Sequence, residues 1–365
     1  MNNYELWLCD QQGYRLKNLT HFTRLEYGRK LNQVSFCKIN TNDLSFWGLL
    51  QKDLRLLILK SVDGGTPFLA GDCCWFTRAW QRTFNDGVMS MELTAASPNY
   101  LIKGREILYA ADTTQTKKTN IAPNVLLTDI IRENMGSSAI SGRNLSSYIT
   151  IGSPSPIGTV INKSCAWKEL EGTFEEICAT ATANGIPLFY DITYNYNTRL
   201  FSFEIFQHQR GTDRGLTSST PVIFSTEMGN INNVVEGIDY IDEITAVAAL
   251  GKGEGVNRAT YELTNSTEIA ASMFGRRERT INSNADTPDQ LQDEAKAALE
   301  TGKAKFTFTA DLLDVGTKFD KHYFWGDKVV VVNFDKQPFD CYIDGYTMTI
   351  ENGKESLKTI TRIVQ

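Results

Sequence analysis

Short runs of apolar, β-branched and aromatic residues, broken by Gly, Asn and Asp, dominate the first hundred positions. Runs of this length and spacing are typical of strands in a small β-barrel or sandwich. The pattern therefore predicts a strand-rich N-terminal region that extends to about Tyr109. The predicted strands are Tyr4–Asp10, Val34–Asn40, Asp53–Lys60, Gly65–Phe76 and Val88–Ala95.

Helical periodicity replaces this pattern in three places further along the chain. After the polar stretch Ala111–Asn120, which reads as a linker, Pro123 opens a predicted helix over Asn124–Gly136. A second helix is predicted over Ala166–Ala183, with its apolar side chains along one face. The third spans Pro288–Glu300, where Thr287 is the predicted N-cap and Gln290 completes a capping box.

Strand patterns return between and after these helices. A hairpin is predicted over Pro187–Gln207, and short strands over Val222–Ser225 and Ile244–Leu250. The last sixty residues contain four more apolar runs, and Asn352-Gly353 between the final two is a strong hairpin signal. The pattern as a whole predicts a mixed, β-dominated (α+β) fold.

Charge and hydropathy exclude several classes of protein. The net charge of −6 over 365 residues argues against a dedicated nucleic-acid binder, which would carry a basic stripe. No basic segment followed by an apolar one opens the chain, and no apolar run approaches the ~20 residues that span a bilayer. We therefore expect synthesis in a cytoplasm and no stable membrane insertion.

The cysteines indicate buried thiols. There are 7 of them, an odd number without any C-x-x-C spacing, which fits reduced core residues better than disulfides or a zinc site. The adjacent pair Cys73-Cys74 lies in an apolar run and is interpreted as core packing.

No motif for catalysis or cofactor binding stands out. The GKGEG segment at Gly251–Gly255 has the wrong spacing for a dinucleotide loop, and the residues after it read as extended, so we interpret it as a turn. The 3 histidines have no ligand partner at short spacing. A cation site at Asp239, Asp242 and Glu243 stays an alternative to a solvated turn. We expect no catalytic residue, cofactor or metal.

One charged cluster is a candidate contact. Arg276, Arg277, Glu278 and Arg279 form the densest group of charges in the chain. They are interpreted either as a solvated turn with local ion pairs or as an inter-subunit contact in which arginine forks bind carboxylates of a neighbour. The residues alone leave both interpretations open. Scattered tryptophans also leave a carbohydrate-binding surface open.

A longer pattern carries a resemblance to a known family. The phrase Phe224-Ser225-x-Glu227-x-Gly229-Asn230, followed by Gly275 and the Arg276–Arg279 cluster, resembles the baseplate hub (tail hub) proteins of siphovirus-like phages. The resemblance implies a structural, non-enzymatic protein of the virion, located at the phage tail tip. These residues would then be a structural motif of the family.

The resemblance also implies an architecture and partners. It predicts a tube-like β-barrel over residues 1–110, a helix-containing insertion over 111–190 and a second barrel-like domain over 191–365. Three copies would form a ring that adapts a six-fold tail tube to a three-fold tip and lets DNA pass transiently. The implied partners are the distal tail protein, the C-terminus of the tape-measure protein and a tip or receptor-binding protein. The alternatives are a tail-associated cell-wall hydrolase and a carbohydrate-binding β module.

Overall fold

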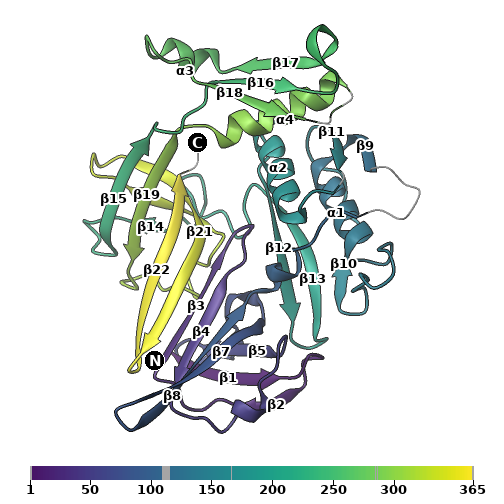
Figure 1. Cartoon of the computed structure of the whole chain (residues 1–365). Helices are drawn as coiled ribbons and strands as arrows, with labels where there is room; N and C mark the ends of the chain where they lie inside the picture. Colours follow the sequence, from purple (N-terminus) through teal and green to yellow (C-terminus); the bar gives the residue numbers. More distant parts are fainter. Residues whose placement is uncertain (1, 109–115, 166, 284, 286, 364–365) are drawn as a thin grey trace.

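The computed structural model describes residues 2–108, 116–165, 167–283, 285 and 287–363. Its largest unit is a 12-stranded sheet that combines strands from the first hundred and the last 150 residues (Figure 1). The strand order is β14-β20-β21-β3-β4-β8-β7-β5-β1-β2, with β22 paired to β21 and β6 to β5. The strands are β1 (Asn3–Cys9), β2 (Arg15–Asn18), β3 (Arg24–Lys30), β4 (Phe36–Thr41), β5 (Arg55–Ser61), β6 (Phe68–Leu69), β7 (Trp75–Asn85), β8 (Val88–Ala96), β14 (Ile223–Phe224), β20 (Lys328–Val332), β21 (Pro338–Glu351) and β22 (Lys354–Ile363).

The seam between β3 and β21 joins the two ends of the sequence. Tyr27 lies opposite Met348 in this antiparallel pair, and both are buried in the same hydrophobic core. A Cβ on Gly28 would collide with the backbone oxygen of Tyr346, so the close approach of the strands requires glycine there. The predicted first and third domains therefore share one sheet and one core.

A second unit lies beside this sheet and contains most of the predicted insertion. Its helices and strands form a second core together with buried residues of β1, β5 and β7, and Phe174, Tyr190 and Phe203 contact one another in it. The carboxylate of Asp191 forms a buried ion pair with Arg29 of β3, which fastens this unit to the large sheet. The elements are β9 (Thr116–Ile121), α1 (Pro123–Asn134), β10 (Ile149–Ile151), β11 (Ile161–Cys165), α2 (Leu170–Ala183), β12 (Leu188–Asn195) and β13 (Leu200–Gln207).

A third, smaller unit covers one end of the molecule, at the top of Figure 1. Its three-stranded sheet has the order β17-β16-β18, and α4 packs on it over a small core that includes Val247 and Leu291. A two-stranded sheet of β15 and β19 connects this unit to the large sheet. The elements are β15 (Ile231–Asp239), β16 (Ala246–Leu250), β17 (Thr260–Thr264), α3 (Ser266–Ala270), β18 (Glu278–Asn282), α4 (Pro288–Thr301) and β19 (Lys305–Leu312).

The predicted helices are confirmed, with corrected boundaries. Thr287 caps α4, since its hydroxyl accepts a hydrogen bond from the backbone N–H of Gln290 at 3.4 Å. The predicted start of the second helix, residue 166, lies outside the described residues, and α2 begins at Leu170. The predicted linker was wrong over residues 116–120, which belong to β9 because this segment pairs with β11; positions 111–115 are not described.

The hydrogen bonding also bears on the predicted barrels. The protein is mostly β, as predicted, with the helices concentrated beside the sheets. Among the described residues, β14 and β2 end the large sheet and do not pair with each other, so no closed barrel is formed by its ladder. The two barrels and the domain boundaries stay predictions.

Candidate assembly interface

The Phe224–Asn230 phrase forms a tight turn after β14. The buried side chain of Asn230 accepts a hydrogen bond from the backbone N–H of Ser225 at 2.9 Å and donates one to the backbone oxygen of Ile223 at 2.8 Å. The Ser225 hydroxyl accepts from the N–H of Met228 at 3.1 Å, and Gly229 has a φ of +65°. Backbone geometry therefore explains why Ser, Gly and Asn occupy these positions.

The two remaining residues of the phrase point in opposite directions. Phe224 is fully buried and packs edge-on against Tyr323, with their ring centroids 5.1 Å apart. Glu227 is exposed at the tip of the turn and forms a surface ion pair with Lys336 at 2.9 Å. The phrase is thus a folding motif with one exposed charged corner.

Gly275 and Arg277 are fixed by a second backbone arrangement, in the small unit. Thr245, just before β16, donates its hydroxyl proton to the Gly275 oxygen at 2.6 Å and accepts from the Arg277 N–H at 2.8 Å. A Cβ on Gly275 would lie 2.5 Å from the backbone oxygen of Ile269 in α3, so only glycine fits. Gly275 and the Phe224–Asn230 turn belong to different sheets, and the fold does not bring them together.

Arg276 is the centre of a surface ion-pair network. Its Nη2 lies 2.6 Å from Oε1 of Glu262 on β17, and its Nε lies 2.6 Å from Oε1 of Glu278 on β18. These hydrogen bonds raise the pKa of the Arg276 guanidinium above its ordinary value. All three side chains are well exposed, so the network contributes little to stability. Arg276 therefore has carboxylate partners within its own chain, as the local ion-pair interpretation predicts. The inter-subunit contact stays a prediction.

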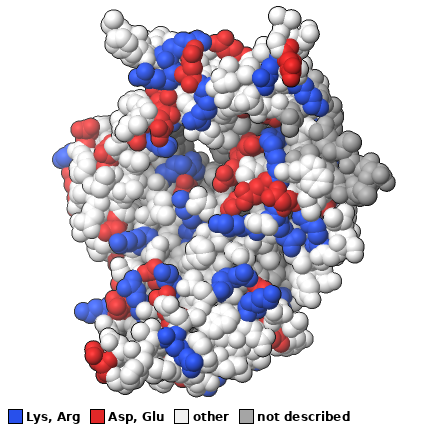
Figure 2. Space-filling model, viewed as in Figure 1, with Lys and Arg blue, Asp and Glu red and all other residues white. Residues whose placement is uncertain are grey.

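Within the described part of the chain, β18 has no strand partner on its outer edge. It is the last strand in the order β17-β16-β18, and four of its five residues are exposed. Charged side chains on an open edge prevent uncontrolled strand pairing. Figure 2 shows basic and acidic side chains interspersed over this part of the surface.

Arg279 lines a cleft of about 400 Å³ between β18, α2 and α4. Lys163 is buried in its wall and pairs with Glu176 at 2.5 Å. Burial alone would lower the pKa of Lys163, but the carboxylates of Glu176 and Glu294 raise it above its ordinary value. Lys163 and Glu176 in the wall of the cleft therefore already neutralise each other's charge.

Exposed apolar side chains lie directly before this charged cluster, a feature that the sequence interpretation missed. Met273 is 92% and Phe274 74% exposed, although both are large apolar residues. Adjoining exposed apolar residues rimmed by charge are typical of protein–protein contact surfaces. We name Met273–Arg279 the assembly segment. The sequence contains the apolar pair Met273-Phe274 directly before the charged residues, but only the structure shows how exposed these two side chains are.

The other candidate chemistry is dispersed. GKGEG is a turn, as predicted, with positive φ at Gly253 and Gly255 and a 3₁₀ turn rather than a helix after it. All seven cysteines are buried, in agreement with the predicted core thiols. Within the described part of the chain, no three His, Cys, Asp or Glu side chains are grouped as metal ligands require, and this includes Asp239, Asp242 and Glu243.

The tryptophans show no shared exposed platform in the residues described. Trp75 and Trp325 are buried, whereas Trp47 and Trp80 are partly buried against the first core. Trp167 is exposed in the second unit. Among the helices of the described residues, none is long and apolar enough to cross a membrane.

The fold just described is that of phage tail proteins. The tail protein from Neisseria meningitidis MC58 superposes with a TM-score of 0.57 at 12% identity, covering 99% of this chain and 96% of that one. The 43 kDa tail protein of prophage MuSo2 from Shewanella oneidensis gives 0.56 at 10% identity over 100% and 98%. Prophage tail protein gp18 from Listeria monocytogenes EGD-e gives 0.52 at 13% identity over 99% and 94%.

The sequence gives the family. Residues 106–361 match the model of the Siphovirus ReqiPepy6 Gp37-like proteins, and the chain belongs to that family. No curated protein sequence matches it. The predicted resemblance to siphovirus-like tail proteins is confirmed, and the family and fold together support the predicted location in the virion tail.

Proposed function

We propose that the chain is a structural hub subunit of a siphovirus-like tail tip, acting through assembly and without catalysis. Three copies form a ring, each with two tube-like β units, and the ring adapts a six-fold tail tube to a three-fold tip. The observation that carries the proposal is the likeness of fold to phage tail proteins over 99–100% of this chain, within a siphoviral family.

A closed ring requires two different faces on each copy that meet with a rotation that closes. The assembly segment is our candidate for one of these faces, with Phe274 as an apolar anchor and Arg276–Arg279 as its charged rim. Arg276 would exchange one of its two exposed local carboxylates for one on the neighbour, at little cost in free energy because exposed pairs are weak.

Passage of DNA is compatible with the chain's charge. A net charge of −6 disfavours counterion-release binding, so DNA would move through the ring without being held. The proposed partners are the distal tail protein, the tape-measure C-terminus and a tip or receptor-binding protein.

The deciding experiment is the native mass of the purified protein, followed by negative-stain images with and without tail partners. A three-copy ring with a central opening is the expected result. A monomer that never assembles and releases sugar from cell-wall material would replace the proposal with the hydrolase. A monomer that binds glycans in a screen would replace it with the carbohydrate-binding module.

A pair of variants tests the assembly segment directly. Phe274→Ser should weaken ring formation about 10- to 100-fold, since a buried aromatic anchor typically contributes ~1.5–3 kcal/mol to an interface. The matched control is Val256→Ser, because Val256 is also an exposed apolar residue but follows β16 at the other end of the same sheet. Equal assembly of both variants and the parent would remove the assembly segment from the interface.

A further inference from the structure

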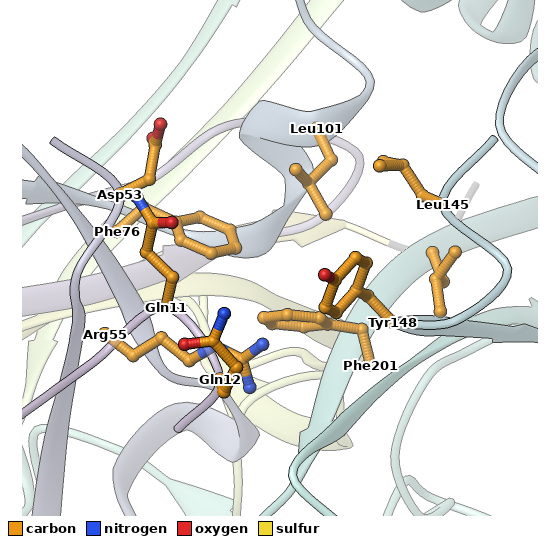
Figure 3. Close-up of a pocket in the computed structure, with 10 residues that line it drawn as sticks. Gln11, Gln12, Asp53, Arg55, Phe76, Leu101, Leu145, Tyr148 and Phe201 are labelled. Carbon is orange, nitrogen blue, oxygen red and sulfur yellow. The ribbon is translucent and has the colours of Figure 1, made fainter. Parts of the chain in front are cut away.

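A cavity of about 260 Å³ lies at the seam between the large sheet and the second unit (Figure 3). One part of its wall is apolar and is made by Phe76, Leu101, Leu145 and Phe201. Another part carries polar groups from Gln11 and Gln12, in the turn after β1, and from Asp53 and Arg55 at the start of β5. The cavity is therefore amphipathic, and its walls come from six separate parts of the sequence.

Arg55 is the unusual residue in this wall. It is only 2% exposed. Its Nη1 donates hydrogen bonds to the Arg199 backbone oxygen at 2.7 Å and to the Tyr194 hydroxyl at 3.4 Å. Its Nε has no hydrogen-bond partner among the residues that the structure describes. The guanidinium carbon lies 4.8 Å from the Phe201 ring centroid.

No carboxylate compensates this charge within the described residues. Arg55 takes part in none of their ion pairs, and the neighbouring Asp53 is already paired with Arg78. A buried cation with neutral partners only is costly, because the lost hydration is not replaced by an opposite charge. An anion entering the cavity would relieve that cost, and the planar fork of a guanidinium matches the geometry of a carboxylate.

The size of the cavity limits what can enter. An engineered cavity of roughly 150 Å³ accepts benzene in another protein, so about 260 Å³ has room for a phenyl or branched alkyl group together with a carboxylate. The rings of Phe76 and Phe201, with centroids 5.3 Å apart, would contact the apolar group. Leu145 and Tyr148 of the second unit close the other side, as Figure 3 shows.

We propose that this cavity binds a small apolar carboxylate, with its apolar group against Phe76, Leu101 and Phe201 and its carboxylate at Arg55. The shared chemistry is a hydrophobic group that ends in a carboxylate. A free acid and the C-terminal residue of a polypeptide both present it. This inference does not depend on the proposed role in tail assembly.

The test measures binding of three probes to the full chain by calorimetry. The probes are 3-phenylpropionate for a free acid, N-acetylphenylalanine for a chain terminus and N-acetylphenylalanine amide, which lacks the charge. At least one of the two acids should bind. N-acetylphenylalanine amide, which lacks the carboxylate, should bind much more weakly than that acid. Binding of 3-phenylpropionate identifies a free acid as sufficient, whereas binding of N-acetylphenylalanine alone identifies a chain terminus.

Two variants separate the cavity from nonspecific binding. Arg55→Gln should weaken acid binding about 10- to 100-fold, the usual range for losing a charged hydrogen bond. Because this change could impair folding, Leu101→Trp serves as a second variant that fills the cavity from a half-buried position. Phe84→Ser, on the exposed β7–β8 hairpin, is the control. No binding of either acid, or acid binding equal to that of the amide and unchanged by Leu101→Trp, would overturn the proposal.

Discussion

Asp191 is a single carboxylate on which two guanidinium groups converge. Arg29 of β3 pairs with its Oδ1 and Arg210 approaches its Oδ2 at 3.2 Å, while Asp191 itself is almost fully buried. Arg210 also stacks over Trp325, with its guanidinium carbon 3.8 Å from the ring centroid. One residue of the second unit thus holds together side chains from three regions of the chain.

Asp191→Asn should therefore destabilise the protein strongly. Removing one partner leaves Arg29 buried without an opposite charge, and such a loss typically costs ~3–5 kcal/mol in the free energy of unfolding. Urea denaturation of the variant and the parent measures the difference. Glu227→Gln is the control, because its ion pair with Lys336 is exposed, and it should change the free energy of unfolding by less than about 1 kcal/mol. Equal changes in the free energy of unfolding for the two variants would show that burial of the Asp191 ion pair does not determine its contribution to stability.

Sequence reasoning at this scale identifies residue types better than partners. The buried cysteines, the Gly-Asn turn and the Thr287 cap follow from local chemistry, which the neighbouring residues determine. Arg29, Arg55 and Asp191 could not be selected among 80 charged side chains, 37 basic and 43 acidic, because their burial depends on strands far apart in sequence.

At the scale of elements, α4 offers the clearest test of a predicted feature. Thr287→Ala removes the hydroxyl that accepts from the Gln290 N–H, so one orphan donor of the first turn loses its partner. The expected loss is about 1 kcal/mol in the free energy of unfolding, measured by urea denaturation.

Thr264→Ala, at an exposed position of β17 on the same small sheet, controls for the loss of a threonine. A loss no larger than that of this control would mean that solvent satisfies the N-terminus of α4 equally well.

Elements with strong local signals were predictable, and those that depend on a partner were not. The three long helices carry periodic apolar faces and recognisable caps or stops. β9 is polar in sequence and becomes a strand only because β11 lies beside it. α3 has five residues, too few for a helical period, and begins at the side-chain cap of Asn265. The assembly segment escaped for a related reason, since exposure of Phe274 cannot be read from its neighbours.

At the scale of the whole molecule, the buried thiols should make the free energy of unfolding decrease as the pH becomes alkaline. Burial raises the pKa of the Cys73, Cys178 and Cys341 thiols to about 12, against roughly 8.5 in an unfolded chain. Below pH ~8.5 both states hold these protons and the contribution is complete. Above it the unfolded state binds fewer protons than the native state, so the free energy of unfolding should fall as pH rises from about 8.5 to about 12.

Urea denaturation across this pH range measures the slope, and Cys178→Ala provides the comparison. Removing one titrating thiol should reduce the slope by at most one proton, which is ~1.4 kcal/mol per pH unit. A free energy of unfolding that stays constant or rises over this range would contradict the assignment of protonated, buried thiols.

The β3–β21 seam also constrains how the protein can be made. Tyr27 and Met348 are paired residues, yet a ribosome adding about 5–20 residues per second needs roughly 15–60 s to travel from one to the other. During that interval β3 must wait with one edge unpaired, in a cell crowded with other nascent strands. The large sheet is therefore completed only at the end of translation. A copy whose translation stops before β21 leaves the ribosome with the edge of β3 unpaired, and it is not a smaller version of the same fold.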